Sequence, residues 1–318
     1  MLELLKSLVE IPSPSGKEDR LIDFIMSRYE GFEVLEGYGI RNLVMNPEAE
    51  LWIVTHIDTV PMKRGFEFDG VYAYGTGVCD TKGSVVAILS AVEVLEDPKF
   101  GVALLSDEEE GGRGSRLFVE SFKPAKAIVM EPTSLKIANV HYGCLEILAR
   151  FDGVSAHGAT PEFGVNAIDL AIDAVTRLRE MGIRMLVQKI VGGWDEYAVP
   201  DSCEVRIDMT FPPEIDPDEL LGRISGILGR YEVLEKDRGF VSGEVTEILR
   251  SAIESTGIKP EFGHMPSWTD AINLKKAGWD VVVFGPGELH LCHTERERIA
   301  LREIELARDV LLRLNELL

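Results

Sequence analysis

The first third of the chain alternates short apolar runs with amphipathic stretches. The runs LWIVTH (51–56), GVALLS (101–106) and AKAIVM (125–130) are apolar and rich in Val, Ile and Leu, which is typical of strands covered on both faces. Between the first two runs, SVVAILSAVEVLE (84–96) has the composition of a helix. Strands and helices in alternation predict an α/β fold, with a mixed, mostly parallel sheet and helices on both faces.

Both ends of the chain carry a capping-box spacing before an amphipathic stretch. Ser15-x-x-Glu18 precedes the helical pattern RLIDFIMSRY, and Thr294-x-x-Glu297 precedes the pattern that closes the chain. A capping box satisfies free amide groups at the start of a helix. We therefore expect both helices to begin at these motifs, and His293 to stand one residue before the closing helix.

The pattern changes in the middle of the chain. Strands with polar alternation, such as CEVRIDMTF, surround the two helical patterns NAIDLAIDAVTRLREMG and PDELLGRISGIL. This combination predicts an α+β unit whose helices cover one face of its sheet. Beyond it, the apolar strand pattern returns in WDVVVFG. We expect two domains: residues 1–140 with 241–318 form the larger one, and residues 141–240 form a smaller one inserted into it.

Composition and charge narrow the class of protein. The 318 residues include 33 Lys and Arg against 54 Asp and Glu, a net charge of −21, which argues against a nucleic-acid partner. No apolar run approaches the roughly 20 residues of a membrane span. The four cysteines show no CxxC pairing, which fits a reducing cytosol. A single glutamine beside abundant Glu, Arg and Lys is typical of a thermophile. We expect a cytoplasmic protein that binds neither nucleic acid nor membranes.

Candidate chemistry gathers at five places along the larger domain. Each lies at or just beyond the end of an apolar strand, where open α/β sheets place their ligands. Any one of them alone has an ordinary explanation as a turn, a helix cap or a solvated loop. Together, histidines and carboxylates suit two divalent ions, and the imidazoles favour zinc or cobalt over magnesium or calcium. The five are His56 with Asp58, Asp80 in a Gly-rich loop, the acidic run Asp107 to Glu110, Glu131, and His293, which has His290 as a rival.

These segments carry a specific resemblance. HIDT, GTGVCDTKG, DEEEGGRGS, MEPTS and CHTERERI resemble the five motifs of the M20 metallopeptidase and deacylase family, and the match runs from the first helix to the last. The resemblance implies that Asp80 bridges two metal ions, that Glu108 is the general base and acid, and that Asp58 orients His56. The metal ligands it implies are His56, Asp80, Glu109, Glu131 and His293.

The acidic run allows two alignments. We align Asp107–Glu109 with the family's D-E-E, because Gly111 and Gly114 then fall on its glycines. The alternative alignment shifts both roles by one residue, so that Glu109 is the base and Glu110 the ligand.

The inserted domain resembles the family's lid and dimerisation domain. GVSAHGATPEFGVNAI is similar to its G-x-x-A-H-x-x-x-P-x-x-G-x-N-A-I segment. The resemblance implies that His157 polarises the scissile carbonyl, often across a dimer interface, and hence that the protein is a homodimer. The alternative is a histidine at the end of a strand that is hydrogen-bonded only locally.

The resemblance also implies a substrate class. The GPGELHLCHT loop is similar to that of the hydrolases that release lysine or ornithine from an amino-group carrier protein. We expect a dinuclear zinc or cobalt amidohydrolase of lysine or arginine biosynthesis that acts on linear amides. Its substrate would be an N-acylated amino acid or a small acidic carrier protein. The alternatives are an acetylornithine deacetylase, a succinyl-diaminopimelate desuccinylase, an M20 dipeptidase, and a metal-dependent binding protein without turnover.

Two segments depart from the family pattern where substrate is selected. Many relatives have Arg in a D-x-R strand motif where this chain has Thr210, and Arg206 lies on the same strand face. An Arg fork binds carboxylates in two-point geometry, so we expect Arg206 to bind the substrate carboxylate. The alternative is a surface Arg paired with Glu204 or Asp208. The family's T-S-D segment appears here as SWTD. The residues expected to bind substrate are therefore Arg206, Ser267 and Thr269.

Overall fold

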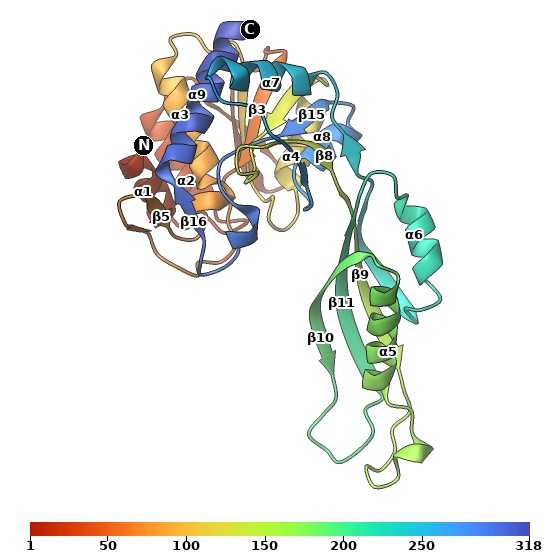
Figure 1. Ribbon diagram of the computed structural model, residues 1–318. Helices are drawn as coiled ribbons and strands as arrows, with labels where there is room; N and C mark the ends of the chain where they lie inside the picture. Colours follow the sequence, from red (N-terminus) through yellow and green to blue (C-terminus); the bar gives the residue numbers. More distant parts are fainter. The chain divides into compact units, whose positions relative to one another are not determined.

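The computed structural model describes residues 1–318, which divide into two compact units (Figure 1). The first unit comprises Met1–Asn139, Ser242–Met265 and Thr269–Leu318, and the second comprises Val140–Val241 with Pro266–Trp268. Each unit has its own hydrophobic core. None of the helices combines the length and the hydropathy needed to cross a bilayer.

The first unit is built on a nine-stranded sheet in the order β1-β2-β6-β3-β7-β15-β8-β13, with β14 paired to β8. The four central strands run parallel, and the strands outside them pair antiparallel. This mixed sheet confirms the predicted fold class. Its strands are β1 (Glu33–Gly37), β2 (Ile40–Met45), β3 (Leu51–His56), β6 (Gly101–Leu105), β7 (Lys126–Val129), β8 (Ile137–His141), β13 (Phe240–Val241), β14 (Phe262–Met265) and β15 (Asp280–Val283).

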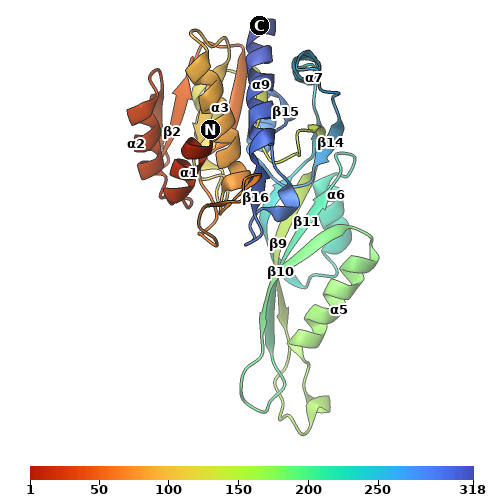
Figure 2. The ribbon, with the colours of Figure 1, turned by 60° about the vertical axis from the view of Figure 1, so that its left-hand side comes forward.

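Helices cover both faces of this sheet (Figure 2). Five of them share one core with the inward side chains of β3 and β6, because alternate residues of a strand face opposite sides. On the other face, Trp52 packs edge-on against Phe118 at 4.9 Å between ring centroids. The five helices are α1 (Leu2–Glu10), α2 (Asp19–Arg28), α3 (Gly83–Val94), α7 (Val245–Ser255) and α9 (Leu301–Leu317); α4 (Arg113–Ser121) and α8 (Ala271–Lys276) lie on the Trp52 face.

The predicted capping box before α2 does not form. The helix begins at Asp19, but the Ser15 hydroxyl donates to Asp58 Oδ2 at 2.6 Å rather than accepting from the helix. Glu18 instead accepts the N–H of Gly16. Ser15 therefore bonds to Asp58, just after β3, and does not cap α2.

The second predicted capping box is also wrong. The closing helix α9 begins at Leu301 and not at residue 294. A turn and the short strand β16 (Arg298–Ala300) come first, and β16 pairs with β5 (Tyr72–Tyr74), which also pairs with β4 (Glu67–Phe68). The Thr294 hydroxyl donates to a carbonyl within its own turn. Glu297 reaches the backbone before α3 instead of a helix start.

The second unit is a four-stranded antiparallel sheet in the order β10-β11-β9-β12. Buried and half-buried residues alternate along β11, and the buried ones pack against two helices on the same face (Figure 1). The opposite face carries the polar side chains. The elements are β9 (Gly143–Asp152), α5 (Ala167–Glu180), β10 (Arg184–Gly192), β11 (Ser202–Phe211), α6 (Pro217–Ile224) and β12 (Arg230–Asp237).

Candidate metal centre

Three potential ligands meet at the carboxyl ends of β3 and β7. His56 is the last residue of β3, Glu131 lies two residues beyond β7, and Asp80 lies in η1 (Val78–Lys82), the turn before α3. His56 Nε2 is 3.0 Å from Asp80 Oδ1 and 3.9 Å from Glu131 Oε1. All three side chains are buried. They form a first triad that can surround one ion.

A second triad shares Asp80 with the first. His293 Nε2 lies 3.2 Å from Asp80 Oδ2 and 2.8 Å from Glu109 Oε2. Asp80 therefore presents one carboxylate oxygen to each triad. This is the arrangement of a carboxylate that bridges two ions. Each group of three ligand atoms fits within 4.8 Å.

The carboxylates of the two triads are buried close together, and added positive charge would stabilise them. Glu131 Oε1 is buried and accepts no hydrogen bond. Burial raises the pKa of Glu131 well above its usual value, with His56 opposing and Asp80 adding to the rise. Contacts with Asp80 and Glu109 raise the pKa of His293 to about 10. A donor set of two imidazoles and three crowded carboxylates fits two divalent cations, which would offset this repulsion.

Asp58 contacts residues of both triads without belonging to either. The Asp58 carboxylate accepts the backbone N–H groups of Glu108 at 3.0 Å and Glu109 at 3.1 Å, in addition to the Ser15 hydroxyl. It also lies 3.4 Å from His56 Nδ1, which is 3.0 Å from the backbone carbonyl of Asp58. Burial opposes ionisation, but the contacts with His56 and these donors lower the pKa of Asp58 below its usual value. Asp58 thus contacts both His56 and the backbone of the acidic run.

The geometry of the acidic run favours one of its two alignments. Glu109 contacts His293, whereas the Glu110 side chain is exposed. Arg113 holds Asp107 from the other side, with Nε and Nη2 at 2.7 and 2.8 Å. Burial raises the pKa of Glu108 well above its usual value, opposed by His56 and reinforced by Glu131 and Glu109. Glu109 thus belongs to the second triad, and Glu108 belongs to neither.

Three other residues predicted for the site, His157, Ser267 and Thr269, belong to neither triad. His157 is exposed, 5.6 Å from the Tyr197 ring, and its Nδ1 accepts the N–H of Ala159 at 3.2 Å. Ser267 is exposed. Thr269 is buried, and its hydroxyl accepts the N–H of Ala271 at the start of α8.

Arg206 is ion-paired with a residue that the sequence did not suggest. Its Nε donates to Glu146 on the neighbouring strand β9, rather than to Glu204 or Asp208. Glu204 is taken by Arg150, at 3.1 Å. Across the sheet, Arg184 on β10 lies opposite Thr210 in the register and is exposed. The strand register brings Arg184 beside the position where the expected Arg is missing.

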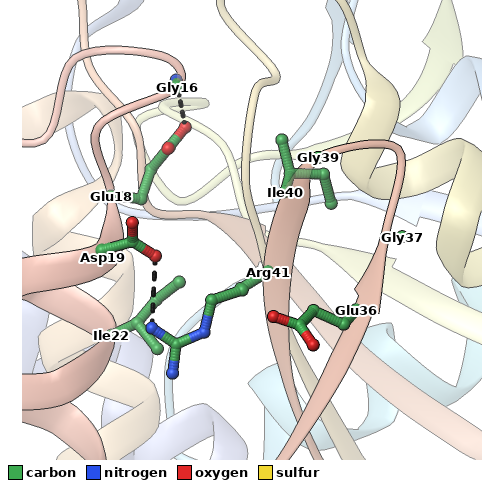
Figure 3. Close-up of a pocket in the computed structure, with 9 residues that line it drawn as sticks. All are labelled: Gly16, Glu18, Asp19, Ile22, Glu36, Gly37, Gly39, Ile40 and Arg41. Carbon is green, nitrogen blue, oxygen red and sulfur yellow. Dashed lines mark hydrogen bonds and ion pairs between the residues drawn. The ribbon is translucent and has the colours of Figure 1, made fainter.

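A hollow of about 500 Å³ lies away from the two triads, between α2 and the β1–β2 hairpin (Figure 3). Three of its charged residues are paired: Arg41 lies 3.2 Å from Asp19, and Glu18 accepts the N–H of Gly16. No ligand of either triad lines it. The lining residues are Gly16, Glu18, Asp19, Ile22, Glu36, Gly37, Gly39, Ile40 and Arg41.

Comparison with known proteins defines the class. Residues 52–316 match Peptidase family M20/M25/M40, and the chain belongs to this family. It is therefore a metal-dependent amide hydrolase, which confirms the resemblance found in its motifs.

Particular relatives span nearly the whole chain. It is 26% identical to the [LysW]-lysine/[LysW]-ornithine hydrolase of Sulfurisphaera tokodaii, over 96% of this chain and 92% of that protein. It is 30% identical to the acetylornithine deacetylase of Myxococcus xanthus, over 92% of this chain and 90% of that protein. A tripeptidase structure from Staphylococcus aureus shares the fold, with a TM-score of 0.82, 22% identity, and coverage of 99% of this chain and 97% of that one.

Proposed function

We propose that the protein is a dinuclear amidohydrolase that releases lysine or ornithine from an N-acylated or carrier-linked precursor. The observation that carries this proposal is the placement of Asp80, which offers one oxygen to His56 and Glu131 and the other to Glu109 and His293. Zinc or cobalt suits this mixture of imidazole and carboxylate ligands.

Each residue around the triads has its own proposed role in the hydrolysis. Two divalent ions, when bound, would acidify an attacking water and polarise the scissile carbonyl. Glu108 accepts the proton of that water and delivers it to the leaving amine, since it lies next to Glu109 of the second triad without belonging to either triad. Asp58 keeps Glu108 and His56 in place through its hydrogen bonds. His157 donates a hydrogen bond to the oxyanion.

The carrier-linked substrate is favoured by the relatives that carry this activity in their names, among them the proteins of Sulfurisphaera tokodaii and Pyrococcus furiosus. We expect purified, zinc-loaded enzyme to release amine faster from carrier-linked lysine than from N-acetylornithine, succinyl-diaminopimelate or a dipeptide, each assayed at equal concentration. Faster release from N-acetylornithine would make it a deacetylase, as its 30% identical relative is named. Release from none of these amides, with both ions bound, would favour a binding protein.

We propose that Arg206 binds the substrate carboxylate, which would replace Glu146 as its ion-pair partner. Arg206→Ala is then expected to raise KM by at least about tenfold, equivalent to about 1.4 kcal/mol, without changing metal content. Arg184→Ala is the matched control, because Arg184 lies on the adjacent strand opposite Thr210 and is exposed. An increase of KM in Arg184→Ala alone would move the role to Arg184.

We propose that the second unit forms a homodimer through β10, an edge strand of its sheet. Leu186 and Ile190 on β10 and Ile172 on α5 are more than half exposed, and a partner would cover them. Light scattering is expected to show a dimer, and Ile190→Glu is expected to yield monomers with reduced kcat, because His157 would act in the partner's site. A monomer with full activity would rule out action across the interface and leave closure within one chain.

A further inference from the structure

Glu297 is a buried carboxylate that belongs to neither triad. It is 2% exposed, and its Oε1 accepts the backbone N–H groups of Cys79 at 3.0 Å and Asp80 at 3.2 Å. Burying a carboxylate is costly unless hydrogen bonds compensate for the lost water. These backbone donors offset part of that cost, and both belong to the turn that carries Asp80.

The turn around Asp80 has an irregular backbone that needs external support. Within η1 (Val78–Lys82), Asp80 and Thr81 depart from helical dihedral angles, so their amides do not follow a regular helical pattern of bonding. Thr81 is held separately, since its hydroxyl donates to the His56 carbonyl at 2.7 Å. Glu297 therefore holds the amides of Cys79 and Asp80, which lie on the N-terminal side of the turn.

Glu297 also lies on the segment that carries His293, four residues earlier. The turn between them is closed by the Thr294 hydroxyl, which accepts the N–H of Arg296 at 3.1 Å. One short segment thus holds a ligand of the second triad and, through Glu297, the backbone of Asp80. Asp80 and His293 are 213 residues apart in sequence, yet their side chains approach to 3.2 Å.

We infer that Glu297 is a positioning residue for the metal pair: it sets the spacing between Asp80 and His293. This inference rests on the proposed dinuclear function. It makes Glu297 the counterpart of Asp58, which contacts His56 and the backbone of Glu108 and Glu109. Neither carboxylate is a ligand, and each ties together two segments that supply ligands.

The test measures metal binding without turnover. Cobalt is titrated into metal-free wild type, Glu297→Ala, Glu297→Gln and Glu297→Asp, and both affinities and the visible cobalt spectrum are recorded. Glu297→Ala is expected to weaken one of the two ions by about 10- to 100-fold, the usual effect of losing a group that orients a ligand. Glu297→Gln keeps an oxygen at the same reach and is expected to restore most of the affinity. Glu297→Asp keeps the charge but is one carbon shorter, and is expected to behave like the alanine variant.

Glu303→Ala is the matched control. Glu303 also accepts a backbone N–H, that of Gly287 at 2.7 Å, but Gly287 is not a member of either triad. Its loss is expected to lower the melting temperature and leave both cobalt affinities unchanged. Circular dichroism at the titration temperature identifies any variant that does not fold, and the Gln and Asp pair decides the question if the Ala variant is one.

Three results distinguish failure of the positioning role of Glu297 from failure of the proposed dinuclear function. Unchanged cobalt affinities and spectrum in folded Glu297→Ala or Glu297→Asp would overturn the positioning role. Full affinity in Glu297→Asp with loss in Glu297→Gln would overturn it too, because charge rather than reach would then matter. A wild type that binds fewer than two ions would instead refute the proposed dinuclear function.

Discussion

Glu108→Gln is expected to lower kcat by about 10²- to 10⁴-fold, the usual contribution of a general base, while the protein still binds two ions. The amide has nearly the same shape as the carboxylate but cannot accept the proton of the attacking water. Glu108 belongs to neither triad, so the substitution removes no ligand. Steady-state kinetics and metal analysis on the same preparation measure both effects.

Two neighbours of Glu108 provide the comparison. Glu109→Gln is expected to lose one ion, because Glu109 contacts His293 in the second triad. Glu110→Gln is expected to keep normal activity and metal content, because its side chain is exposed. Loss of an ion in Glu110→Gln, with full metal content but no turnover in Glu109→Gln, would mean that the acidic run is aligned one residue too early.

Asp80→Ala is expected to abolish turnover and to weaken both ions together. Asp80 is the one residue common to the two triads, so its removal takes a ligand from each. Equilibrium dialysis against zinc, with the bound metal counted per chain, measures this effect.

The contrast is with ligands that belong to a single triad. Glu131→Gln and His293→Ala are each expected to weaken one ion and spare the other, because Glu131 belongs only to the first triad and His293 only to the second. An Asp80→Ala protein that retained one ion at wild-type affinity would show that Asp80 is not a bridge.

The sequence predicted the convergence of the ligand residues because the topology determines it. His56 and Glu131 end or follow neighbouring parallel strands, β3 and β7, and the acidic run follows β6, which pairs with β3 on the other side. The carboxyl ends of parallel strands meet at one edge of a sheet. The positions of the apolar runs in the sequence are therefore enough to predict that these motifs lie at the same edge of the sheet.

The choice of side-chain partners could not be predicted in the same way. Ser15 and Glu297 both have capping-box spacing, yet each forms hydrogen bonds with a remote segment, to Asp58 and to the turn at Asp80. A spacing rule considers only local donors and cannot weigh a competing partner brought near by the fold. The residues after Glu297, Arg298–Ala300, form a strand, and Ala300 caps α9 without a side-chain hydrogen bond.

Arg206 shows the same limit within the sheet of the second unit. Residues 204, 206 and 208 lie on one face, so neighbours along the strand were the natural candidates for its partner. The cross-strand register instead places β9 beside β11, and Glu146 provides the carboxylate. Strand pairing order is a property of the whole fold, and the spacing along one strand does not contain it.

The central claim is that Asp80 bridges two ions, each also held by a histidine and a glutamate. The most direct measurement is anomalous diffraction at the zinc absorption edge from crystals of the zinc-loaded enzyme. Two peaks are expected on either side of the Asp80 carboxylate, about 3.5–4 Å apart, one beside His56 and Glu131 and the other beside Glu109 and His293. A single peak, or a second peak that Asp80 does not contact, would contradict this claim.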